Sequence, residues 1–355
     1  MPYRFFSIPL AGLVAALILL PPVVPGHTTQ LLLPGELHEA SLAVIDAMYG
    51  ENYREAETIA GRIINTFPDH PAGYFYKAVS VYSWMESHKS QAREDEFIGL
   101  CEQAIDKGES RADKNPGEVW TRFFIAGAEG FLGMYEFHHC RWISAFKWGS
   151  RGMSILRDLK EQNDMPDLDY GIGSYEYWRS ALVNRLWWIP RGDDRRIPAI
   201  EKLKRVRKLG IYTRSFAGES LVEAYLNDDK FPDALSQSDE MLLQYSESRI
   251  FLFARAEALE GLKHFDDAAA IYRQILRGVG KSSTPDSTVA AYVHFGIGRI
   301  DYLEGRYNES LNEWEAMRRL GSGKESMREL KGYFEEEERY RKQAERSGSR
   351  HASAD

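Results

Sequence analysis

The sequence predicts an all-α protein built from repeated pairs of helices, and three observations lead to this fold class. Runs of alternating β-branched residues bounded by Asn-Gly or Asp-Gly turns, which mark strands, are almost absent. Apolar residues recur at helical spacing through nearly the whole chain. Similar segments also follow one another: 34 residues separate Ala234 from Ala268, and 42 separate Ala268 from Ser310. A period of this length indicates a helical repeat array.

The composition limits the classes of function. The 355 residues are 43% apolar and 28% charged, which argues against wholesale disorder and against a polytopic membrane protein. There are 45 Lys and Arg residues against 53 Asp and Glu residues, so the formal net charge is −8. This balance argues against nucleic acid as the main partner, because phosphate binding requires positive surface. Two cysteines exclude a disulfide scaffold and a multi-cysteine zinc module.

Residues 1–26 are interpreted as a signal peptide or an N-terminal membrane anchor. One basic residue, Arg4, precedes an uncharged stretch, and three prolines then end any helix. Cleavage after Gly26 is the first alternative. The second is an uncleaved anchor over residues 5–24, which are just long enough to span a bilayer, and the third is a buried structural helix. Under the first two, we expect the rest of the chain to be exported and therefore periplasmic or extracellular.

The first two helix pairs are predicted over residues 36–68 and 70–116. In the first pair, the closing proline, Pro68, follows the small residue Ala56 by twelve positions. In the second, Ala104 precedes a proline by the same twelve positions, with a longer loop between the helices. Prolines at these points are expected to end the second helix of each pair.

Residues 117–212 depart from this pattern through their aromatic content. Fifteen aromatic residues lie between 117 and 190, including six of the eight tryptophans. Helical periodicity persists and predicts helices over 118–137, 140–160, 169–184 and 195–209. Gly171 and Gly173 form a lone G-x-G without a preceding strand, so we expect close helix packing there and no phosphate loop.

A basic run follows the aromatic residues. Between residues 185 and 208 there are nine Lys or Arg residues against three acidic ones. Aromatic rings beside guanidinium groups bind peptides, carboxylates or glycans, and Trp and Arg dominate binding hot spots. The alternative is that the rings fill a thick core and the basic residues coat an exposed face. Under the binding interpretation, the candidate contacts are Trp178, Arg179, Arg185, Trp187, Trp188, Arg191 and Arg195.

Three further pairs are predicted over residues 213–246, 248–280 and 289–320. The clearest unit is the second, in which two helices flank a turn at residues 261–263. Its second helix places four residues on one apolar face: Phe265, Ala268, Tyr272 and Ile275. The first of the three units has Phe231 and Ala234 in the matching places, and the third has Tyr307 with Ser310 replacing the alanine.

These units resemble the tetratricopeptide repeat (TPR), in which a small residue, an aromatic residue, an alanine and a closing proline recur. The resemblance implies a right-handed superhelical array of antiparallel helix pairs, a TPR-like α-solenoid, over residues 27–323. One helix pair cannot bury its apolar face alone, so neighbouring pairs complete the core.

The resemblance also implies a function. We expect a non-catalytic protein-binding scaffold of the cell envelope that takes a peptide segment or helix of a partner protein in its groove. Tyr74, Arg255 and Asp301 are the family positions expected to face that groove. The alternative is a small-molecule or glycan-binding module that uses the aromatic-rich middle as a closed pocket. The partner's identity and the oligomeric state stay open.

Catalytic and metal-binding patterns are absent from the sequence. It contains no G-x-S-x-G, H-E-x-x-H or Walker motif, so we expect no enzyme and no cofactor. Glu136, His139 and Cys140 share a helix face, but no second ligand pair lies nearby in the sequence, so no metal site is expected. Cys101 and Cys140 are two free buried thiols or, after export, a disulfide.

The C-terminal segment is strongly charged. Residues 324–346 contain several acidic–basic pairs four residues apart, which are typical of a solvated helix, and we expect this helix to cap the array. Residues 347–355 are predicted to be disordered.

Overall fold

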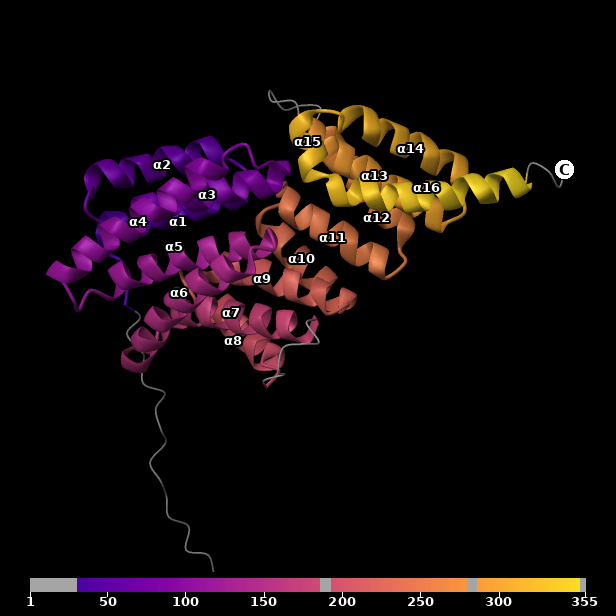
Figure 1. Ribbon diagram of the computed structural model, residues 1–355. Coiled ribbons are helices and arrows are strands. Elements are labelled where there is room, and N and C mark those ends of the chain that lie inside the picture. Colours follow the sequence, from indigo (N-terminus) through magenta and orange to yellow (C-terminus); the bar gives the residue numbers. More distant parts are fainter. Residues whose placement is uncertain (1–30, 186–192, 280–285, 352–355) are drawn as a thin grey trace, which may run out of the picture. The chain divides into compact units, whose positions relative to one another are not determined.

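Sixteen helices and no strands make up the part of the chain that the computed structural model describes, residues 31–185, 193–279 and 286–351 (Figure 1). The all-α prediction is therefore confirmed. The first fourteen helices form seven consecutive pairs: α1 (Gly35–Tyr49) with α2 (Tyr53–Thr66), α3 (Ala72–His88) with α4 (Glu94–Lys114), α5 (Val119–His138) with α6 (Trp142–Gln162), α7 (Pro166–Arg185) with α8 (Arg196–Leu209), α9 (Arg214–Asn227) with α10 (Phe231–Gln244), α11 (Arg249–Gly261) with α12 (Phe265–Val279), and α13 (Ser287–Leu303) with α14 (Tyr307–Leu320).

The signal-peptide or anchor prediction falls on residues 1–26, which lie outside the described residues. Within the described helices, none combines the length and the apolar character that a membrane crossing requires.

Five of the helix pairs are joined by the same three-residue turn. The middle residue of this turn has a positive φ in each pair: Glu51, Cys140, Asp229, Lys263 and Gly305. The next residue donates its backbone N–H to the carbonyl oxygen five positions earlier, at 2.8–2.9 Å, which is the Schellman arrangement that ends helices. The α5–α6 pair uses this turn too. The backbone repeat therefore continues into the aromatic-rich middle.

The residues that follow this turn explain the repeat pattern of the sequence. The first residue of the second helix is aromatic in all five pairs: Tyr53, Trp142, Phe231, Phe265 and Tyr307. Three positions later, Ala56, Ala234, Ala268 and Ser310 are fully buried, and Ala145 of α6 is only half-buried. Packing also requires a small residue at Gly298 of α13, because a Cβ atom there would lie 2.5 Å from Nε1 of Trp314.

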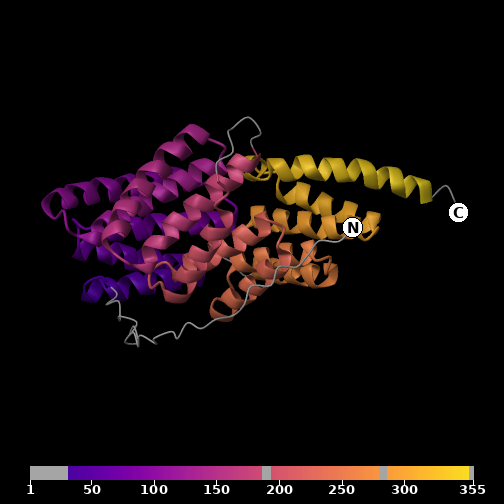
Figure 2. The same cartoon turned by 90° about the horizontal axis from the view of Figure 1, so that it is seen from below.

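The first helices of neighbouring pairs also contact one another. α1 packs on α3, α3 on α5, α5 on α7, α7 on α9 and α9 on α11, and α3 in addition contacts α11 (Figures 1 and 2). At the α1–α2 turn, the Tyr49 ring centre lies 5.4 Å from that of Tyr245 and 5.7 Å from that of Phe251, and Nε of Arg249 donates to Glu51 at 2.7 Å. We call the sides of α3, α5, α7, α9, α11 and α13 that point toward one another the inner face.

Helix boundaries in the middle agree closely with the prediction, and those at the C-terminal end differ. The expected helices over 118–137, 140–160, 169–184 and 195–209 correspond to α5–α8. The expected 324–346 helix is instead two helices, α15 (Lys324–Glu329) and α16 (Lys331–His351), because Leu330 between them turns into the core and is 1% exposed. α16 packs on α13 and α14. It also continues for five residues into the tail that was expected to be disordered.

Candidate functional site

Only part of the predicted aromatic and basic site is covered by the described residues. Trp178 and Arg179, adjacent in α7, both line a cavity. A guanidinium nitrogen of Arg195 lies 3.5 Å from the Glu176 carboxylate, and the Arg195 backbone N–H donates to the hydroxyl of Ser180 at 3.0 Å. The remaining candidates, namely the side chain of Arg185 and all of Trp187, Trp188 and Arg191, lie outside the described residues.

The three positions taken from the TPR pattern have structural partners. Nε of Arg255 donates to Asp239 at 2.6 Å, on the side of α11 that faces α10. Asp301 is 6% exposed and accepts from Nε of Arg306 at 3.0 Å, within the α13–α14 turn. Tyr74 is half-buried against the core. The expectation that these three side chains face the groove stays a prediction.

On α11, the inner face lies two residues away from the predicted position, Arg255. On α11 it is formed by Phe253 and Glu257, which flank Arg255 in the sequence and point to the opposite side of the helix. Phe253 contacts the Tyr292 ring of α13 at 5.0 Å between ring centres. Nζ of Lys89, at the end of α3, lies 5.5 Å from the same phenylalanine ring. These contacts identify the side of α11 that meets α3 and α13.

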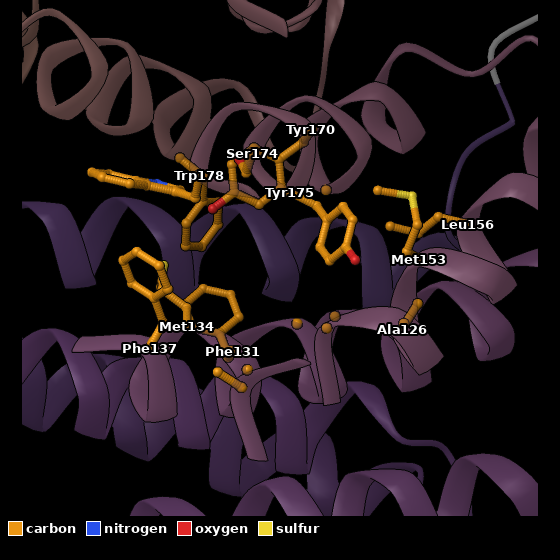
Figure 3. Close-up of a pocket in the computed structure, with 18 of the residues that line it drawn as sticks. Ala126, Phe131, Met134, Phe137, Met153, Leu156, Tyr170, Ser174, Tyr175 and Trp178 are labelled. Atoms are coloured by element: carbon orange, nitrogen blue, oxygen red, sulfur yellow. The ribbon is translucent and has the colours of Figure 1, made fainter. Parts of the chain in front are cut away.

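An apolar cavity of about 200 Å³ lies between α5, α6 and α7. Figure 3 shows Tyr175 and Trp178 of α7 opposite Phe131, Met134 and Phe137 of α5. The Trp178 and Phe137 ring centres are 5.7 Å apart. Walls made almost wholly of carbon exclude water-soluble polar ligands and favour apolar groups.

Glycines on α5 and α6 determine the shape of this cavity. A Cβ atom on Gly133 would lie 2.9 Å from the backbone nitrogen of Gly149, and one on Gly152 would lie 2.8 Å from the carbonyl oxygen of Ala126. The two helices therefore touch backbone to backbone at these points. Gly130, which also lines the cavity, has nothing within 4 Å of its Cβ position, so its missing side chain leaves open space.

Large apolar side chains are exposed on the first turn of α6. Trp142 is 42% exposed, Ile143 89% and Phe146 65%. Trp142 and Phe146 also line the cavity. Contiguous exposed apolar residues of this size typically mark a binding surface.

A second feature, which the sequence analysis missed, is a group of carboxylates on the inner face. Glu219 and Glu223 lie one turn apart on α9, and both are half-buried. The hydroxyl of Tyr49 donates to Glu219 at 2.5 Å. Glu86 of α3 lies close enough to raise the pKa of both carboxyls, and the nearby Lys89 lowers them. We call Glu86, Glu219, Glu223 and Glu257 the inner carboxylates.

Burial changes the protonation of these groups. Desolvation is the main cause that raises the pKa of Glu219 to about 7, and the charge of Glu86 adds to it. Desolvation together with the charges of Glu219 and Glu86 raises the pKa of Glu223 to about 8. Burial likewise raises the pKa of Glu257. The group is therefore only partly ionised near neutral pH.

Glu136 and His139, expected to share a helix face with Cys140, are held by neighbouring groups. Glu136 accepts from Nε of Arg141 at 2.6 Å, and Nδ1 of His139 lies 2.8 Å from the carbonyl oxygen of Tyr135. In the described part of the chain, no group of three or more potential ligands is placed to hold a metal ion. Cys101 and Cys140 are both free, and Cys140 is exposed rather than buried, because it occupies the turn between α5 and α6.

Comparisons with known proteins give structural neighbours only. No protein-family model matches the sequence, and a search of curated proteins found no match. Among solved structures, a human IFIT1 dimer with PPP-AAAA is 14% identical over 82% of this chain and 69% of that chain, with a TM-score of 0.45. The C-terminal part of a TPR repeat-containing protein from Cytophaga hutchinsonii is 16% identical over 83% and 99% of the two chains, with a TM-score of 0.38. The TPR2AB-domain:pHSP90-complex of yeast Sti1 is 12% identical over 87% and 98%, with a TM-score of 0.29.

Proposed function

We propose that this chain is a non-catalytic scaffold of the cell envelope that binds a basic segment of a partner protein on its inner face. The observation that carries the proposal is the set of inner carboxylates. Glu86, Glu223 and Glu257 make no hydrogen bond or ion pair with another side chain in the described part of the molecule. The nearby cation Lys89 lowers the pKa of three of the four carboxyls, those of Glu219, Glu223 and Glu257.

The physical reason is the unfavourable free energy of keeping these carboxylates away from water in the unbound protein. Carboxylates removed from water are destabilised, which is why their pKa values rise, and the charge of Lys89 offsets only part of this effect. A lysine or arginine side chain placed among them would restore the lost charge stabilisation. Binding would therefore favour a basic segment and reject an acidic one. A helix in the groove and an extended peptide both fit this chemistry.

The experiment measures binding of fluorescein-labelled octalysine to the full chain by anisotropy. We expect binding that is tighter at pH 8 than at pH 6, because the carboxyls of Glu219 and Glu223 ionise between these values. The double variant Glu219→Gln, Glu223→Gln should bind about fivefold more weakly or worse. Glu102→Gln, at an exposed position of α4, is the matched control and should bind like wild type.

Several results would contradict the proposal. Equal binding by the double variant and the control would remove the inner face as the site. Equal binding of labelled octaglutamate would show that charge does not select the ligand. An affinity pull-down from envelope extract, with the same two variants, then identifies the natural partner.

The envelope location is a separate part of the proposal and is supported by residues 1–26 alone. Its test is a fusion of these residues to a reporter enzyme that is active only outside the cytoplasm. Activity that disappears on replacing the apolar segment supports export, and the mass of the purified chain distinguishes a cleaved signal from an anchor. A reporter that stays inactive with the intact segment refutes export.

A second candidate function is acid–base catalysis, and the same pair of carboxyls favours it. Groups with pKa values of about 7 and 8 can donate and accept protons at physiological pH. A bell-shaped pH profile for hydrolysis of any nitrophenyl glycoside, abolished by Glu219→Gln, would support this candidate over the scaffold.

A further inference from the structure

The cavity between α5, α6 and α7 lies next to a basic hollow, with which it shares two lining residues. A second hollow of about 280 Å³ is lined by three arginines, Arg157 of α6, Arg179 of α7 and Arg195 before α8, together with Tyr175 and Glu176. Tyr175 and Arg179 line both spaces. An apolar interior and a cationic mouth are therefore adjacent.

Two of the three arginines in the basic hollow have no carboxylate partner among the described residues. Arg195 is paired with Glu176, whose carboxylate also accepts from Lys202. Arg157 and Arg179 are both exposed, and within the described part of the chain neither forms an ion pair. A pair of guanidinium groups without carboxylate partners is suited to bind an anionic headgroup with charge-assisted hydrogen bonds.

The interior accepts a hydrocarbon and not a sugar. The walls contributed by α5 and α6 offer only apolar side chains and glycine, and Ser174 of α7 is one of the few hydroxyl-bearing residues in the lining. A sugar placed there would lose hydrogen bonds to water that these walls do not replace. An alkyl chain has no such loss.

The size suits a medium-length chain. An apolar cavity of about 150 Å³ in another protein holds benzene, and the present one is about 200 Å³. The exposed side chains of Trp142 and Phe146 extend the apolar surface beyond the enclosed part. Several methylene groups are therefore covered.

We propose that this cavity binds the alkyl tail of a medium-chain fatty acid, whose carboxylate lies at Arg157 and Arg179. This site is separate from the inner carboxylates and does not rest on the scaffold function proposed above. Burial of each methylene group would contribute to affinity, and the arginines would select an anionic over a cationic headgroup.

The test titrates the full chain with decanoate and follows tryptophan fluorescence, since Trp142 and Trp178 line the site. Decyltrimethylammonium, with the same tail and the opposite charge, is the headgroup control. Gly130→Leu fills the cavity where a Cβ meets no atom within 4 Å. Its matched control is Gly99→Leu on α4, which has equal space but lines no described cavity. Both changes replace a helical glycine by a better helix former, so both variants should fold.

We expect saturable binding of decanoate to wild type and to Gly99→Leu. Gly130→Leu should bind at least about tenfold more weakly, the equivalent of roughly two displaced methylene groups. The variant Arg157→Gln, Arg179→Gln should weaken decanoate binding by about threefold to fivefold and leave decyltrimethylammonium unaffected. Arg54→Gln, Arg62→Gln, at exposed positions of α2, should behave like wild type.

Each contrary result overturns a defined part of the proposal. Absence of decanoate binding to wild type, or unchanged binding to Gly130→Leu, refutes the cavity as the site. Unchanged binding to the arginine variant, or tighter binding of the cationic amphiphile, refutes the anionic headgroup. Octalysine binding to Gly130→Leu should stay at the wild-type level, so failure here and failure of the scaffold proposal are distinguishable.

Discussion

Substituting Glu223 by glutamine tests the electrostatics of the inner face directly. The carboxyl of Glu223 has a pKa of about 8, raised mainly by desolvation and then by Glu219 and Glu86. Its ordinary value is 4.5. Below pH 4.5, the group is protonated in both folded and unfolded chains and contributes no pH dependence. As the pH rises from 4.5 to about 8, the unfolded chain loses its proton first, so the free energy of unfolding decreases.

The magnitude follows from the size of the shift. One pKa unit corresponds to about 1.36 kcal/mol, so a shift from 4.5 to about 8 sets an upper limit near 5 kcal/mol. The side chain is only half-buried, and solvent screening reduces this limit. We therefore expect the wild type to lose about 2 kcal/mol of unfolding free energy between pH 5 and pH 8 through this residue.

The groups that face Glu223 determine how the variant behaves. They are Glu86 and Tyr82 on α3, Lys89 directly after α3, Tyr170 on α7, and Glu219 on α9. Glutamine cannot ionise, so the variant carries no negative charge at this position at any pH. Glu223→Gln should then be more stable than wild type at pH 8, by about 2 kcal/mol, and nearly equal to it at pH 5.

The assay is urea unfolding followed by circular dichroism at several pH values from 5 to 8. Wild type, Glu223→Gln and the surface control Glu102→Gln are compared at constant ionic strength. The control should show the wild-type pH dependence. If Glu223→Gln shows the same decrease in stability with pH as wild type, burial does not shift this carboxyl and the electrostatic reasoning is wrong.

Two further predictions concern the start of α9 and the two cysteine thiols. Asp167, which is 1% exposed, accepts the backbone N–H groups of Ile211, Tyr212 and Thr213 just before α9. Asp167→Ala should therefore lower the unfolding free energy, measured by urea denaturation, by about 2–4 kcal/mol. A change below about 0.5 kcal/mol would show that these hydrogen bonds do not stabilise the start of the helix. A maleimide reagent should label Cys140 in the native protein and Cys101 only after denaturation. The reason is that burial makes Cys101 inaccessible and raises the pKa of its thiol. Two labels on the native protein, counted by mass spectrometry, would contradict the burial of Cys101.

The repeat units were predictable from sequence because their signals are local. An aromatic residue directly after a three-residue turn, followed three positions later by a small residue, depends on hydrogen bonds within one hairpin. The register of the inner face was not predictable in the same way. In α3 the residues from Ala78 to Ser83 are all buried, so several sides of the helix are covered. A helix without one polar side gives no periodic signal for the direction of the groove.

The cavity lies beside the α5–α6 pair, which has the aromatic and small residues of the repeat pattern but does not bury them fully. In α2, α10, α12 and α14, the small residue three positions after the turn aromatic is fully buried by the neighbouring helices. In α6 the same positions are Trp142, which is 42% exposed, and Ala145, which lines the cavity. The contact between α6 and α7 is smaller than that between α5 and α6. A ligand that covers apolar surface left exposed by folding gains about 25 cal/mol of binding free energy per Å². The irregular packing of the α5–α6 pair therefore creates the binding site.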